Sequence, residues 1–312
     1  MITLPDFKEK QILFIQIDIK AENKIKFSNE NILFLKDNKI INRASCHKVF
    51  VVFVIGDISI TTVLLREASK YGISMFFMKN NFESYATVNS KSEGNYLLKE
   101  RQYKMTKKYA LELSKNIVKN KISNQMFLLG KNNKDKEKIF NQIEKVDNIK
   151  SLLGLEGNVS KEFFKEFFKE VGWFRRMPRV KPDISNFLLD LGYTILFNFI
   201  DSLLLLYGFD TYKGFYHQLF FQRKSLTCDI VEPFRSIIDK QLLKSYNLKQ
   251  INENDFIFKN GKYSIKFEKG QKYSQIFAQS IMDNKENIYL FIQSFYRSLM
   301  NDKNNFNQFK IK

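Results

Sequence analysis

The chain has 312 residues, of which 44% are hydrophobic and 27% are charged, so it has room for two packed domains and is not a disordered or collagen-like protein. Its formal net charge of +18 favours a polyanionic partner such as nucleic acid. The abundance of Lys, Asn, Ile and Phe also indicates a low-GC genome, which enriches lysine by itself. Charge alone therefore does not distinguish a nucleic-acid-binding protein from one that is merely basic.

The cysteines and the N-terminus predict a cytoplasmic protein. Cys46 and Cys228 are the only cysteines and form no CxxC pair, which argues against a disulfide scaffold or a structural zinc site and fits a reducing compartment. The first residues, MITLPDFKEKQ, lack the basic start and the apolar core of a signal peptide.

The first part of the chain has the pattern of β-strands. Alternating or continuously apolar segments predict strands at residues 11–19, 24–27, 32–36, 48–56 and 72–78. The segment 48–56 is apolar throughout, as expected of a strand that is covered on both faces. Residues 57–69 change period and predict a short helix, which Ser59 or Thr61 could cap.

A polar, turn-rich segment, residues 79–95, predicts a domain boundary. We therefore expect an α+β protein: a small N-terminal β-sandwich domain over residues 1–90, and a larger, mainly α-helical catalytic domain over residues 91–312.

Apolar residues recur at three- and four-residue steps beyond this boundary, which predicts helices. The pattern predicts one long helix over 96–122, and others over 134–149, over 159–171 and from Asp183 or Ser185 through Leu206. Residues 187–209 are apolar enough to suggest a membrane span. Asp190 and Asp201 lie within them, however, and each would cost about 3 kcal/mol at the membrane centre, so we expect a buried helix and no membrane.

The segment 254–267 interrupts the helical pattern. Two alternating stretches flank Asn260-Gly261, which predicts a β-hairpin with a type I′ turn. Two more helical segments close the chain.

Histidine is scarce, and the two histidines differ in their surroundings. His47 is best explained as a structural residue at a strand edge. His217 precedes Asp229 by twelve residues, and Glu232 follows three residues later. The spacing places Asp229 and Glu232 on one face of a helix that we expect to start near Asp229, because Pro233 is tolerated only in a first turn.

A third acid, Glu156, stands between glycines in LLGLEGNVS, and Gly154 and Gly157 would let the backbone pack closely around it. Carboxylates with one imidazole suit Mg²⁺ or Mn²⁺ and leave positions open for phosphate oxygens. Zinc also accepts these ligand types. On residue types and spacing alone, an ordinary structural role for each side chain remains open.

Arginines cluster near these acids, in a chain whose composition otherwise favours lysine. The candidate phosphate contacts are Arg175, Arg176, Arg179, Lys181, Arg223, Lys224 and Arg235. Guanidinium groups bind phosphates with two parallel hydrogen bonds, and Trp173, beside the first cluster, could stack on an exposed base. A solvated loop with surface arginines is the alternative.

Four segments together resemble the CRISPR-associated spacer-acquisition integrase and endonuclease family ("Cas one"), in particular its members beside type V effectors. They are LLGLEG (152–157), PRVKPDISNFLLDLGYTILFN (178–198), GFDTYKGFYH (208–217) and RKSLTCDIVEPFRSIID (223–239). The N-terminal VFVIGDISITTVLLREASKYGISMFFM fits the family's β domain more loosely.

The resemblance implies Glu156, His217 and Asp229 as catalytic metal ligands for Mg²⁺ or Mn²⁺, with Glu232 supporting the site or reaching a second metal. It also implies a homodimer that binds double-stranded DNA, with two such homodimers flanking a dimer of the small "Cas two" partner. The hairpin over 254–267 has no counterpart in this resemblance.

The implied chemistry is transesterification, in which the 3′-OH of a short DNA fragment attacks a phosphodiester at the edge of a repeat. Endonuclease activity is the expected side reaction, with water as the nucleophile. A metal-dependent nuclease on branched DNA and a non-catalytic basic DNA-binding subunit are the alternatives.

Overall fold

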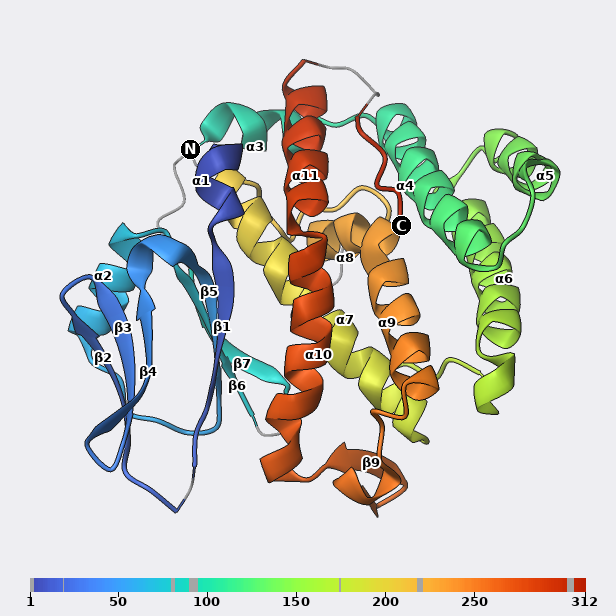
Figure 1. The fold of residues 1–312 in the computed structure, drawn as a ribbon. Helices are drawn as coiled ribbons and strands as arrows, with labels where there is room; N and C mark the ends of the chain where they lie inside the picture. The colour runs from blue at the N-terminus through green and yellow to red at the C-terminus, as the bar shows by residue number, and fades with distance from the viewer. Residues whose placement is uncertain are drawn as a thin grey trace.

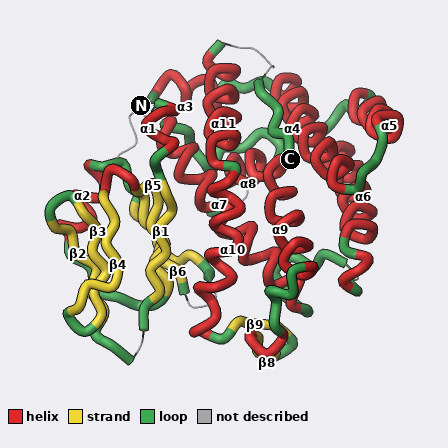
Figure 2. Tube along the Cα trace, in the orientation of Figure 1, coloured by secondary structure: helices red, strands yellow, loops and turns green. Residues whose placement is uncertain are grey.

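The structure is a computed structural model, and it describes residues 3–18, 20–79, 82–89, 95–173, 175–217, 221–301 and 306–312. Two β-sheets lie on one side of the molecule and a bundle of helices lies on the other (Figure 1). Strands are concentrated in the first ninety residues, and the remainder is mainly helical except for one hairpin (Figure 2). The protein is thus a mixed α+β structure with a β-sheet N-terminal region.

The N-terminal region contains two sheets. The four-stranded sheet has the order β1 (Gln11–Gln16), β5 (Val49–Ile55), β6 (Ser74–Met78), β7 (Ser84–Val88), and the antiparallel three-stranded sheet comprises β2 (Asn23–Ser28), β3 (Asn31–Lys36) and β4 (Lys39–Ser45). Strands β1, β5 and β6 are parallel, and β7 runs antiparallel to β6. Helix α2 (Thr62–Lys70) connects β5 to β6, and Thr61 caps it by accepting from the main-chain N–H of Leu64.

Strand β5 is buried along its whole length, which confirms the prediction from its continuous apolar run. Val52 and Val54 face a core that the two sheets share with α2. Phe53 and Ile55, on the opposite face, belong to the core of the helical region. The N-terminal sheet therefore serves both cores, and the predicted division at residue 90 remains a prediction.

The helical region is built around one buried helix. The helices are α1 (Leu4–Lys8), α3 (Tyr96–Tyr103), α4 (Lys107–Leu128), α5 (Asn133–Glu144), α6 (Ile149–Phe167), α7 (Ile184–Tyr207), α8 (Ser225–Val231), α9 (Arg235–Asn247), α10 (Gly270–Asp283) and α11 (Lys285–Met300). Of the two predicted starts of α7, Asp183 and Ser185, it is Asp183 that caps the helix, by accepting from the N–H of Asn186. Helix α7 is the one described helix long and apolar enough to cross a membrane, and 78% of its apolar window is buried in the protein, as expected of a core helix.

Several predicted elements were wrong. The predicted long helix over 96–122 is two helices, because α3 ends at Tyr103 and α4 begins anew at Lys107, where Thr106 caps it by accepting from the N–H of Tyr109. The helix predicted over 159–171 begins ten residues earlier, at Ile149, where Asn148 caps it. Strands β4 and β7 were missed. Strand β4 is exposed along most of its length, so it lacks a buried face that would show in the sequence.

The hairpin prediction is confirmed. Strands β8 (Phe256–Lys259) and β9 (Lys262–Ile265) pair antiparallel. Asn260 and Gly261 both have positive φ, 54° and 72°, which is the requirement of a type I′ turn. Part of the predicted boundary segment 79–95, namely residues 80, 81 and 90–94, lies outside the described residues.

Candidate active site

A cavity of about 1370 Å³ lies between the edge strand β7 and the helices α4, α6, α7 and α8. Six of the seven predicted phosphate-binding residues line it: Arg176, Arg179, Lys181, Arg223, Lys224 and Arg235. Arg175 is exposed outside it and contributes its carbonyl oxygen to the side chain of Asn186. The cavity is therefore a basic groove, and we refer to it below as the groove.

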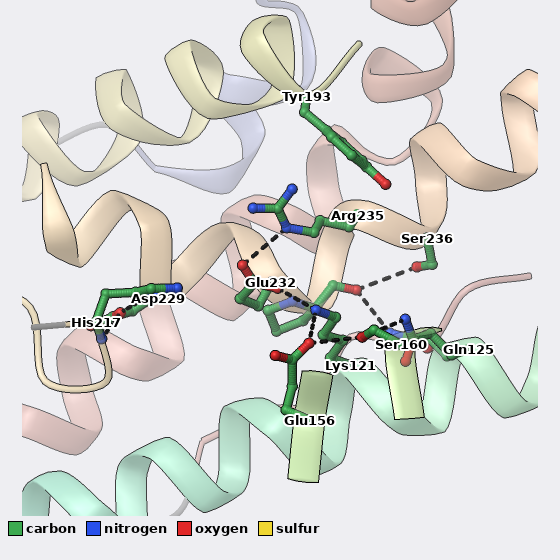
Figure 3. A network of polar contacts seen from close by, with 12 residues as sticks. Lys121, Gln125, Glu156, Ser160, Tyr193, His217, Asp229, Glu232, Arg235 and Ser236 are labelled. Atoms are coloured by element: carbon green, nitrogen blue, oxygen red, sulfur yellow. Dashed lines mark hydrogen bonds and ion pairs between the residues drawn. The ribbon is translucent and has the colours of Figure 1, made fainter. Parts of the chain in front are cut away.

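Two of the predicted acids line the groove, and they share a lysine. Glu156 projects from α6 and Glu232 from the short 3₁₀ turn Glu232–Phe234 that follows α8. The ammonium group of Lys121, on α4, contacts Glu156 Oε1 and lies 2.7 Å from Glu232 Oε2 (Figure 3). Ser160, one turn along α6, donates to Glu156 Oε1 at 2.8 Å. Three segments far apart in sequence thus converge on one cation.

Electrostatics stabilise this buried arrangement in its charged form. Burial raises the pKa of Glu232, but the positive charges of Arg235 and Lys121 outweigh burial and bring the pKa down to about 2. Burial likewise lowers the pKa of Lys121, and Glu156 with Glu232 more than compensate, so it stays protonated. Arg235 Nε lies 3.0 Å from Glu232 Oε1, and its guanidinium sits 4.7 Å from the ring centroid of Tyr193.

His217 and Asp229 form a second unit beside the acid pair (Figure 3). Asp229 Oδ1 lies 2.7 Å from His217 Nδ1 and accepts from the main-chain N–H of His217 at 2.8 Å. Asp229 Oδ2 accepts from the N–H groups of Phe215 and Tyr216 at 2.7 and 3.0 Å. The carboxylate is completely buried and each oxygen already has two hydrogen bonds. Its geometry is that of a group that orients the imidazole and fixes the 215–217 segment.

Gly214 is the glycine that allows this close packing. A Cβ there would lie 2.7 Å from Asp229 Oδ2 and 2.8 Å from the backbone of Ser225. The expectation that Gly154 and Gly157 serve this purpose around Glu156 was wrong, because both lie inside α6 and a Cβ at either position meets nothing within 4 Å.

The expected start of the helix at Asp229 was also wrong. Helix α8 begins at Ser225, and Asp229 lies in its second half. Pro233 is tolerated because the chain leaves α8 there for a 3₁₀ turn before α9 begins at Arg235.

Several of the cations in the groove are held by acids that are partly or fully buried. Arg176 pairs with Asp190 on α7, and Lys224 lies 2.7 Å from the fully buried Asp201. Asp190 also accepts from the main-chain N–H of Arg179, at 3.0 Å. The two aspartates that argued against a membrane span therefore position groove cations.

Trp173 does not stack on bases as the sequence suggested. It is 7% exposed, packs against the rings of Phe164 and Phe168, and donates through Nε1 to Asp183. Its role is to fix the segment that carries the arginines.

Sequence reasoning missed Lys121 and the buried pair Tyr193 and Asp239. The Tyr193 hydroxyl donates to Asp239, and burial raises the pKa of that carboxyl to about 7. Lys121 stands in a helix rich in lysine, so no local signal distinguishes it; its role appears only when α4, α6 and the turn after α8 are packed together.

The donor types fit a divalent cation, and the acid pair already binds a cation. Among the described residues, however, no group of three or more His, Cys, Asp or Glu side chains is arranged to hold a metal ion. Lys121 is the cation between the two glutamates. The hydroxyl of Tyr216 and the Nδ2 of Asn198 are buried without a hydrogen-bond partner in the described part of the chain, so polar capacity remains around the site.

Comparison with known proteins identifies the family. Residues 19–279 match the family described as CRISPR associated protein Cas1. The chain belongs to this family. All four of the segments singled out in the sequence lie inside the Cas1 match.

The chain resembles Cas1 proteins over most of its length. It is 27% identical over 274 residues to "CRISPR-associated endonuclease Cas1 1" of Thermodesulfovibrio yellowstonii, covering 81% of this chain and 86% of the relative. Its fold matches that of a casposase bound to integration product, with a TM-score of 0.83 and 19% identity over 97% of this chain and 95% of the casposase. It also matches a chain of a Cas6-RT-Cas1–Cas2 complex, with a TM-score of 0.79 and 24% identity over 97% of this chain and 36% of the other.

Proposed function

We propose that this Cas1 protein is the integrase of CRISPR adaptation, which inserts short DNA fragments into a repeat array by metal-dependent transesterification and cuts DNA as a side activity. The observation that carries the proposal is a buried glutamate, Glu232, and a partly buried one, Glu156, that converge on one cation at the wall of a basic groove. Family membership and the likeness in fold to an integration complex support it.

Glu156, Glu232 and His217 would hold the divalent ion, Mg²⁺ or Mn²⁺. When bound, such an ion stabilises negative charge on the phosphate and lowers the barrier to attack by a hydroxyl. Asp229 orients His217, because its own oxygens are occupied by main-chain N–H groups. The resemblance had placed Asp229 among the ligands; this geometry favours Glu232 in that role.

The remaining groove residues would grip the DNA backbone. Arg179, Arg223 and Lys181 line the groove, and none of their side chains is paired with an acid in the described part of the chain. Guanidinium groups that lack an acid partner suit contacts with phosphates. Double-stranded DNA is thus the proposed partner. A homodimer, joined to a dimer of the small Cas2 partner, is the proposed assembly, and the Cas6-RT-Cas1–Cas2 neighbour supports Cas2 as the partner.

An integration assay tests the function. The purified chain, with and without Cas2, is incubated with Mn²⁺, a short DNA with free 3′-OH ends and a supercoiled plasmid that carries the repeat. Joined products are expected. Cut products alone would mean a nuclease on branched DNA, and binding that ignores Mn²⁺ without any product would mean a non-catalytic DNA-binding subunit.

Variants connect the activity to the site. Glu156→Ala, His217→Ala and Glu232→Ala should each abolish joining while leaving DNA binding largely intact. Glu166→Ala is the matched control, because Glu166 is a half-exposed residue of the same helix as Glu156 and pairs with Lys131. Normal joining by Glu156→Ala would refute the assignment.

A further inference from the structure

The Lys121 ammonium is the most buried cation contact of the acid pair. The side chain is 10% exposed, and its Nζ bridges Glu156 Oε1 and Glu232 Oε2. The other oxygen of Glu232 is taken by Arg235, and Ser160 shares Glu156 Oε1. A buried and a partly buried carboxylate are thus matched by two cations, which offset the repulsion between the two acids.

This neutral arrangement conflicts with a bound metal. A divalent ion between Glu156 and Glu232 would add two positive charges to a site that is already balanced, and it would need the oxygens that Lys121 contacts. One of the two resident cations must leave. Arg235 is anchored by the ring of Tyr193, whereas a lysine carries a point charge on a flexible stem.

We propose that Lys121 is the resident counter-cation of the acid pair: it holds Glu156 and Glu232 together in the metal-free protein and leaves their oxygens when the divalent ion binds. The inference rests on the proposed function. Lys121 lines the groove, so its ammonium has a path into the groove, where substrate phosphates can replace the carboxylates as its counter-ions.

The consequence is competition between lysine and metal. A site that is open for only a fraction of the time shows an affinity reduced by that fraction. If Lys121 occupies the acid pair nine-tenths of the time, its removal tightens Mn²⁺ binding about tenfold. The metal-free variant should also be less stable, because the carboxylates of Glu156 and Glu232 then repel each other with only Arg235 to balance them.

The test is a direct titration of Mn²⁺ into wild-type protein and Lys121→Met, with free Mn²⁺ followed by electron paramagnetic resonance and thermal unfolding measured with and without the ion. We expect Lys121→Met to bind Mn²⁺ about tenfold more tightly. Its Tm without the ion should fall by several degrees, and the Mn²⁺-induced rise in Tm should exceed that of wild type. Lys121→Gln serves if the Met variant does not fold.

Lys115→Met is the matched control. Lys115 is a buried lysine of the same helix, but it pairs with Glu112 and the carbonyl of Glu144, away from the acid pair. It should lose stability without any change in Mn²⁺ affinity. Mn²⁺ affinity in Lys121→Met equal to or weaker than that of wild type would overturn the inference and leave the proposed function standing. Absence of Mn²⁺ binding in wild type and in both Lys121 variants would refute the metal site itself.

Discussion

The role of Asp229 can be decided by one substitution, Asp229→Asn. The carboxylate accepts four hydrogen bonds, two at each oxygen, from three main-chain N–H groups and the imidazole of His217. Asparagine keeps the shape of the side chain but replaces one oxygen with an NH₂ group, which cannot accept a hydrogen bond from the N–H groups around it. With the NH₂ group at the Oδ2 position, the two bonds from Phe215 and Tyr216 are lost. With the NH₂ group at the Oδ1 position, the bond from the main-chain N–H of His217 is lost and the imidazole must move its proton from Nδ1 to Nε2.

The expected loss of stability follows from these contacts. Hydrogen bonds to a charged group contribute roughly 1.5–3 kcal/mol each, so two of them amount to roughly 3–6 kcal/mol. The entropy of unfolding is about 2.1 cal/mol/K per residue, or about 0.65 kcal/mol/K for this chain. The Tm of Asp229→Asn should therefore fall by roughly 5–9 °C.

Thermal unfolding without divalent ions measures this loss, and Asp57→Asn, at an exposed position, is the control that should change Tm little. Gly214→Ala approaches the same contact from the other side and should lower Tm comparably, because its Cβ would lie 2.7 Å from Asp229 Oδ2. A Tm of Asp229→Asn within about one degree of wild type, together with loss of joining, would show that Asp229 acts in the chemistry and not as a support.

Three further predictions follow from the same structure. Gly157→Ala should stabilise the protein by up to about 1 kcal/mol, because alanine has the higher helix propensity in α6 and the new Cβ meets nothing within 4 Å. Chemical unfolding measures this change, and a variant less stable than wild type would mean that the Cβ makes a close contact. Burial raises the pKa of Asp239 from 3.8 to about 7, so the native protein holds this proton at pH values where the unfolded chain has lost it, and the stability that the proton contributes is lost as pH rises from 4 to 7. The difference in unfolding free energy between wild type and Asp239→Asn should therefore shrink by up to about 1.4 kcal/mol per pH unit over this range. A difference that does not change with pH would contradict the raised pKa. Arg223→Ala should weaken DNA binding and reduce the slope of log affinity against log salt by about 0.9, whereas an unchanged slope would exclude a phosphate contact.

The sequence predicted best where one segment determines its own structure. The apolar run of β5, the cap at Asp183 and the Asn260-Gly261 turn depend on neighbours in the chain, and all three were predicted. Strand β7 was not, because its pairing with β6 gives it only partial burial and its residues read as a polar turn.

The candidate site shows the same division. The acids and His217 could be singled out from motifs, and the groove was anticipated from clustered arginine. The residues that each acid contacts could not be predicted from the sequence. Glu232 stands three residues from Asp229, yet one carboxylate faces Lys121 and Arg235 and the other faces main-chain N–H groups. That separation depends on the change from α8 to a 3₁₀ turn between them, which spacing does not encode.

The chain has a net charge of +18, and the cations that line its groove are of two kinds, those paired with an acid and those without an acid partner. Arg176, Lys224 and Arg235 each have a carboxylate partner that is partly or fully buried, so their charge is locally cancelled and their geometry is fixed. The side chains of Arg179 and Arg223 are not paired with an acid in the described part of the chain. Long-range attraction of DNA must come mainly from the second kind, because paired charges produce little field beyond a Debye length of about 8 Å. The first kind acts at contact, where a phosphate can share a guanidinium that is already in position. Salt should therefore weaken the capture of DNA far more than the joining step that follows it.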